Sequence, residues 1–84
     1  PLPARGSAML RYVLSGGASV RLTVYDALGR RVRELVPEAT QSQGEHRASW
    51  DGRDDLGREV APGVYVARLS VDGAMRSQRI PLVR

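Results

Sequence analysis

Short segments of alternating apolar and polar residues, separated by turn-forming residues, recur along the whole chain of 84 residues. The clearest example is the stretch 49–69, SWDGRDDLGREVAPGVYVARL, in which two strand-like ends flank a loop rich in Asp, Gly and Pro. Alternation with a period of two predicts β-strands, because successive side chains of a strand point to opposite faces. Asp, Gly and Pro predict the turns between them. Since no helical periodicity of useful length intervenes, the sequence predicts an all-β fold.

Six segments read as strands, and a seventh short strand would fit the same spacing. These segments are 8–14, 20–25, 30–36, 46–50, 64–71 and 74–83. Residues 37–44 are polar and are expected to form a crossover, whereas Asp72 and Gly73 form a strong two-residue hairpin signal. Pro81 removes a ladder donor and indicates an edge strand or a bulge. Short strands at this spacing predict an antiparallel β-sandwich of the immunoglobulin or fibronectin type, with about seven strands. We expect residues 1–7 to be a tether and residues 8–84 to be the sandwich.

The alternation also predicts which side chains face the core. The expected inward residues are Leu10, Tyr12, Leu14, Val20, Leu22, Val24, His46, Ala48, Trp50, Tyr65, Ala67, Leu69 and Val71. Arg21 and Thr23 are expected to point to solvent, and a bulge would bring Val32 and Leu35 to one face. Trp50 is expected to anchor the core, because it lies in phase with its inward neighbours and directly precedes the turn-rich loop.

Packing alone must stabilise this chain. It has no cysteine, so neither disulfides nor thiolate metal sites are available. A domain of this size hides only about 60–65% of the surface that its unfolded chain exposes. No run approaches the roughly 18 apolar residues of a membrane span, and the N-terminal residues lack the apolar core of a signal peptide. We expect the chain to be a piece of a longer protein, with any export signal upstream of Pro1.

The net charge of +4 comes from arginine alone, since all 13 basic residues are Arg. Phe and Asn are also absent, as expected for a GC-rich genome. The arginines are spread over the predicted strands: Arg11, Arg21, Arg33, Arg47, Arg68, Arg76 and Arg79. We interpret them as the solvated face of a sheet. The alternative is a surface that binds nucleic acid or an anionic polysaccharide. Because the arginines are spread over the strands, we expect no nucleic-acid partner.

No set of residues suggests catalysis, a metal or a cofactor. A serine nucleophile needs a base within reach, and the serines have only one histidine among them. That residue, His46, is expected to pack within a strand. Asp51, Asp54 and Asp55 could suggest calcium, but their spacing does not match an EF-hand, and neighbouring arginines would repel a cation. Asx turns explain them better. Among the aromatic residues only Tyr25 is expected to be exposed, which leaves carbohydrate binding as a weaker alternative.

Several motifs, taken in order, resemble one bacterial family. They are Val24-Tyr25-Asp26-x-x-Gly29-Arg30, Trp50-Asp51-Gly52-x-Asp54, Gly57, and Gly63-Val64-Tyr65. The chain is similar to the C-terminal sorting domain of type IX secretion cargo, which is related to the immunoglobulin-like domain of the flagellar hook-capping protein. Two departures stand out: Leu2 replaces the Asn of a usual Pro-Asn-Pro opening, and Arg76 and Arg79 stand where the last strand often carries Lys.

The resemblance implies a non-catalytic module of a secreted bacterial protein. Such a module would direct export through the outer membrane and attachment of an upstream passenger at the cell surface. Its partners would be the outer-membrane secretion and attachment machinery, with a cell-surface glycan or lipopolysaccharide as a further candidate. We expect recognition at the last strand, through Arg79, Ile80, Leu82, Val83 and Arg84. The alternative is a structural immunoglobulin-like module, of the hook-capping type or a spacer.

Overall fold

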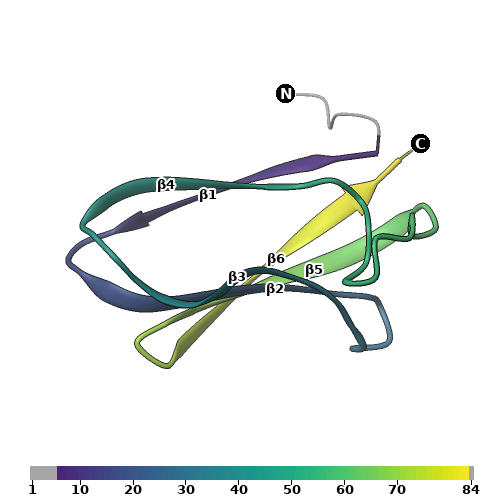
Figure 1. The fold of residues 1–84 in the computed structure, drawn as a ribbon. Helices are drawn as coiled ribbons and strands as arrows, with labels where there is room; N and C mark the ends of the chain where they lie inside the picture. The colour runs from purple at the N-terminus through teal and green to yellow at the C-terminus, as the bar shows by residue number, and fades with distance from the viewer. Residues whose placement is uncertain (1–5, 84) are drawn as a thin grey trace.

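The computed structural model describes residues 6–83 and shows six strands and no helix among them. The strands are β1 (Ala8–Leu14), β2 (Ala18–Tyr25), β3 (Arg31–Gln41), β4 (Gly44–Trp50), β5 (Gly63–Val71) and β6 (Ala74–Leu82). A two-stranded sheet, β1-β4, packs on a four-stranded sheet ordered β3-β2-β5-β6, and every pairing is antiparallel (Figure 1). The predicted immunoglobulin-like sandwich is confirmed, with six strands where about seven were expected. Nothing within residues 6–83 could cross a membrane as a helix.

The core lies between the two sheets and follows the predicted alternation. Its main cluster consists of Leu10, Leu22, Val24, Val32, Trp50, Tyr65, Ala67, Ile80 and Leu82. A smaller cluster at the other end contains Leu14, Ala18 and Val20. Trp50 is fully buried, as expected for the anchor of a small core.

The predicted bulge in β3 is present, and the β2–β3 pairing shifts register at three places. Val24 pairs with Arg33 and Tyr25 with Arg31, so Val32 is an extra residue on β3. Leu35 is extra in the same way. As a result Val32 is buried and Leu35 packs against the main core cluster, although strict alternation would separate them.

Two expectations about this sheet were wrong. Residues 37–44 do not form a loop, because β3 continues to Gln41 and pairs with Ala18 at the start of β2. The segment is polar because it lies at a sheet edge with solvent-facing positions, and only Ser42 and Gln43 connect β3 to β4. Thr23 is buried rather than exposed. It lies in a central strand between residues with longer side chains on both neighbouring strands, which shield it.

The last hairpin agrees with the prediction. Asp72 and Gly73 both have positive φ, 48° and 86°, as a type I′ turn requires. The hairpin places β6 at one edge of the four-stranded sheet. Pro81 therefore lies in an edge strand, where a missing backbone donor is tolerated.

Candidate functional site

The loop between β4 and β5, residues 51–62, begins directly after Trp50, which is fully buried. The indole Nε1 donates to the carbonyl of Arg53 at 3.0 Å, and the ring meets Tyr65 edge-on with centroids 5.1 Å apart. Tyr65 is buried too, and its hydroxyl donates to the carbonyl of Ala61. Gly52 has φ 73°, and its carbonyl accepts the N–H of Val60 at 3.0 Å. Both ends of the loop are thus fixed to the core, and Gly63 begins β5 directly after it.

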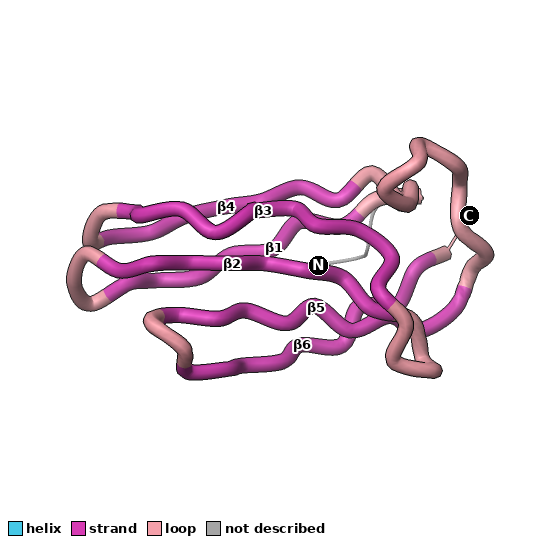
Figure 2. The backbone as a smooth tube through the Cα atoms, turned by 60° about the horizontal axis from the view of Figure 1, so that its bottom comes forward, coloured by secondary structure: helices cyan, strands magenta, loops and turns pink. Residues whose placement is uncertain are grey.

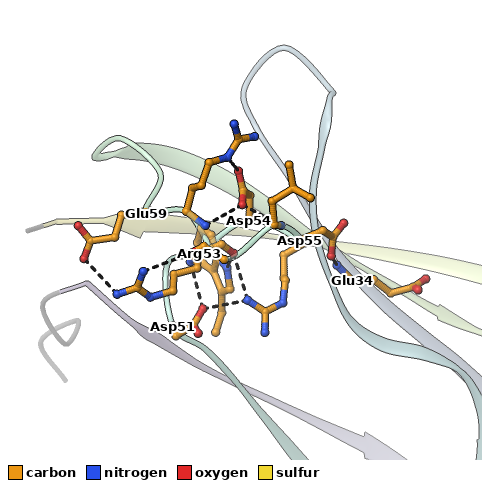
Figure 3. Close-up of polar contacts among 11 residues, drawn as sticks. Glu34, Asp51, Arg53, Asp54, Asp55 and Glu59 are labelled. Atoms are coloured by element: carbon orange, nitrogen blue, oxygen red, sulfur yellow. Dashed lines mark hydrogen bonds and ion pairs between the residues drawn. The ribbon is translucent and has the colours of Figure 1, made fainter.

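Asp54 organises the tip of this loop. Its Oδ1 accepts the backbone N–H groups of Leu56 and Arg58, each at 2.9 Å, and its Oδ2 accepts Nε of Arg58 at 3.1 Å (Figure 3). The carbonyl of Asp54 also accepts the N–H of Gly57, which adopts φ 82°. One carboxylate therefore closes the whole turn, as predicted for an Asx turn.

The neighbouring aspartates connect the loop to β3 and to its own backbone. Asp55 accepts the backbone N–H of Glu34 at 3.0 Å and Nε of Arg31 at 3.0 Å. Asp51 accepts the N–H of Arg53 at 3.1 Å and forms an ion pair with Arg33 at 3.1 Å. Figure 3 shows these carboxylates pointing to different donors rather than to one centre. Within residues 6–83 no group of three or more His, Cys, Asp or Glu side chains could hold a metal ion.

The turn between β2 and β3 repeats the Asp54 turn, a relation that the sequence analysis missed. Asp26 accepts the N–H groups of Leu28 and Arg30, each at 2.9 Å, and Nε of Arg30 at 2.8 Å. Gly29 has φ 83° and donates to the carbonyl of Asp26. The signal was present in the sequence as Asp-Ala-Leu-Gly-Arg at 26–30 and Asp-Asp-Leu-Gly-Arg at 54–58. Both turns lie at the same end of the sandwich (Figure 2).

Hydrogen bonds from backbone N–H groups favour the charged form of three carboxyls in these loops. The pKa values of Asp26, Asp54 and Asp55 are all lowered. The largest cause is the N–H of Arg30, Arg58 and Glu34, respectively. These groups are arranged to remain ionised and to shape loops, which is the opposite of what a general acid needs.

The recognition residues expected on the last strand fall into two groups. Ile80 and Leu82 are buried in the main cluster, so their direct role is packing. Arg79 is exposed, and Val83 is 44% exposed just beyond β6. Arg84 lies outside the described residues.

His46 and the aromatic residues are placed as follows. His46 stacks on Tyr12 with ring centroids 5.5 Å apart, and its Nε2 lies 2.7 Å from the carbonyl of Ser42. It is thus a packed strand residue. Tyr25 is only partly exposed, because the guanidinium of Arg68 stacks on its ring at 4.7 Å. A flat, open sugar platform is therefore not formed at Tyr25.

Most arginines of the described chain are neutralised by carboxylates. The paired ones are Arg11, Arg21, Arg30, Arg31, Arg33, Arg47, Arg53 and Arg58. Within residues 6–83 the arginines without an ion pair are Arg68, Arg76 and Arg79, which all lie on β5 and β6. The uncompensated positive charge is thus gathered on one hairpin.

Comparison with protein families gives a match to the FlgD Ig-like domain over residues 4–74. The chain belongs to this family. The crystal structure of FlgD from P. aeruginosa shares the fold, with 28% identity and a TM-score of 0.63 over 87% of this chain. The crystal structure of dimeric latent PorU from Porphyromonas gingivalis shares the fold, with 23% identity and a TM-score of 0.74 over 99% of this chain. The chain spans 57% and 9% of those proteins, respectively. Comparison with curated proteins gives no match.

Proposed function

We propose that this FlgD Ig-like domain is a non-catalytic module that directs a secreted bacterial protein through the outer membrane and attaches it to the cell surface. The upstream passenger would carry any chemistry, and the domain would act outside the cytoplasm, after passage through the periplasm. Its partner would be the outer-membrane secretion and attachment machinery, with a cell-surface glycan or lipopolysaccharide as the anchor.

The observation that carries this proposal is the state of β6. It is an edge strand whose exposed Arg79 has no acidic partner among residues 6–83, and Val83 follows it with a half-exposed side chain. Edge strands offer backbone groups that a partner can extend. The motifs that resemble type IX sorting domains support the same assignment.

A reporter fusion tests the proposal. Residues 1–84 fused to a periplasmic reporter should carry it to the surface or the medium in a host with a type IX apparatus. Arg79→Ser combined with Arg84→Ser should impair export while leaving the melting temperature nearly unchanged. Arg47→Ser is the matched control, because this exposed arginine lies on β4, in the other sheet. Retention of a folded fusion in the periplasm would contradict the proposal, and parental export by the double variant would move recognition away from β6.

The second candidate is a purely structural module of the hook-capping type, or a spacer. The family match favours a structural module, since the matching family is the FlgD Ig-like domain. The parent gene separates the two candidates: a sorting domain must end its protein, so further folded sequence after Arg84 would favour the structural module.

A further inference from the structure

The sandwich has one open side, between β1 and β6. The β1-β4 sheet has two strands and faces a sheet of four, so it covers only part of it. At one end of this side the two sheets are joined, because the N–H of Gly6, just before β1, donates to the carbonyl of Val83, just after β6, at 2.7 Å. From there β1 and β6 diverge toward their far ends (Figures 1 and 2).

A groove occupies this diverging side. It has a volume of about 420 Å³, within the roughly 300–1,000 Å³ of ordinary ligand clefts. Tyr12 and Val13 line it from β1, Leu69 from β5, and Arg76 and Gln78 from β6. A second hollow of about 230 Å³ shares Val13, Leu69 and Arg76 with it, so the two form one continuous depression toward the β5–β6 turn.

The exposure of β6 follows the shape of this groove. Ile80 and Leu82 are buried, yet all residues from 74 to 79 are exposed. Ala74, Arg76 and Gln78 have the same phase as Ile80 and therefore point to the core side of the sheet. They are exposed because no strand of the smaller sheet covers them.

The backbone of β6 is free along the same length. The two-residue turn makes Val71 and Ala74 a hydrogen-bonded pair, so even-numbered residues of β6 bond to β5. Met75, Ser77 and Arg79 then direct their N–H and C=O groups to the open edge. Val83 is also odd-numbered, and its carbonyl accepts the backbone N–H of Gly6. A strand added to this edge would form its hydrogen bonds in the same way.

The positive charge of β6 indicates which kind of partner its free edge would bind. Arg76 points into the groove and Arg79 points to the opposite face, and neither has an ion pair within residues 6–83. The only acidic residue of the β5–β6 hairpin is Asp72, in the turn. A second copy adding its own β6 would bring further unpaired arginines to the same edge and no carboxylates to offset them, so it complements the charge of this edge less well than an acidic segment does.

We infer that the free edge of β6 and the groove beside β1 bind an extended acidic segment of a partner protein. The segment adds to β6 as a strand, places apolar side chains on Leu69 and Tyr12, and places carboxylates near Arg76 and Arg79. This inference rests on the β6 edge that the proposed function also uses, and it names the chemistry of the partner there. Binding of an acidic segment is measured on the isolated chain, so it can succeed or fail independently of export.

Peptide binding to the isolated chain tests the inference. The probes are a capped octapeptide of alternating valine and aspartate and a matched peptide of alternating valine and lysine, titrated into the ¹⁵N-labelled chain to about 1 mM. The aspartate peptide should shift the amide signals of Met75, Ser77 and Arg79 and should bind roughly tenfold more tightly than the lysine peptide. Arg76→Glu with Arg79→Glu should reverse this preference.

Proline substitutions separate backbone pairing from simple charge attraction. Ser77→Pro removes an edge N–H and should abolish binding with little change in the melting temperature. Gln78→Pro removes an N–H that bonds to β5 and should unfold the hairpin. The inference is overturned if neither peptide binds, if both bind equally, or if the shifts lie outside β6 and the groove. It is also overturned if binding survives Ser77→Pro, or if heparin binds at these residues and the aspartate peptide does not.

Discussion

Replacing Trp50 by Ala should remove a large part of the stability of this domain. The side chain is fully buried, packs edge-on against Tyr65 and donates a hydrogen bond to the carbonyl of Arg53. Deleting a buried tryptophan side chain costs about 3–5 kcal/mol, from lost burial and the residual cavity. A domain of 84 residues has a free energy of unfolding of only about 4–12 kcal/mol. The variant should therefore be much less stable than the parent, and unfolded if the parent lies at the lower end of this range.

Urea denaturation followed by far-ultraviolet circular dichroism measures this effect, since the variant lacks the only tryptophan. With a slope of about 1 kcal/mol per molar urea, the midpoint should fall by about 3–5 M, or the protein should be unfolded without urea. Trp50→Phe keeps much of the packing but loses the N–H donor, and should lose about 1–2 kcal/mol. Leu56→Ala is the control, because this side chain is 76% exposed and its loss should change stability by less than about 0.5 kcal/mol. A Trp50→Ala midpoint equal to that of Leu56→Ala would refute the role of Trp50 as the core anchor.

Two further predictions concern the turns. Gly57→Ala should destabilise the domain by about 1–2 kcal/mol, because Gly57 adopts φ 82°. Gly16→Ala is the control and should not destabilise it, because this position has open space and no positive φ. Equal melting temperatures of the two variants would contradict the assigned turn. Stability should be constant above about pH 5 and fall below pH 4, because the folded pKa values of Asp26, Asp54 and Asp55 lie below the unfolded value of 3.8, so the unfolded chain takes up protons first. Urea midpoints measured from pH 7 to pH 2 check this, and a midpoint that does not change below pH 4 would show that these carboxylates are not linked to folding.

The fold could be predicted because most strands of this chain bury one face only. Leu10, Tyr12 and Leu14, for example, alternate with exposed residues, so period and burial agree. Thr23 escaped prediction because its burial depends on long side chains on two neighbouring strands, which a local pattern does not contain. The extension of β3 to Gln41 escaped for the same reason: its pairing partner begins at Ala18, in another part of the sequence.

Some local features around the candidate site could be predicted. Pro81 correctly indicated the edge strand, and the Asp-rich loop correctly indicated Asx turns. Recognition through the last strand stays a prediction, in which Arg79 is exposed whereas Ile80 and Leu82 are buried in the main core cluster. The groove could not be predicted, because it arises from the unequal number of strands in the two sheets and from the divergence of β1 and β6.

The Asp26 and Asp54 turns also bear on the order of folding. The sandwich pairs distant residues, such as Ala8 with Trp50, and closing such long loops slows the folding of β-proteins. The bonds of the two turns span four residues at most, so they can form before either sheet exists. We expect the β2–β3 hairpin to form around Asp26 in the folding transition state and β1 to dock on β4 afterwards. Stopped-flow kinetics of Asp26→Ala should then show slower folding with little change in unfolding, whereas Leu10→Ala should mainly accelerate unfolding. The reverse pattern would mean that the sheet with the most distant partners is the first to assemble.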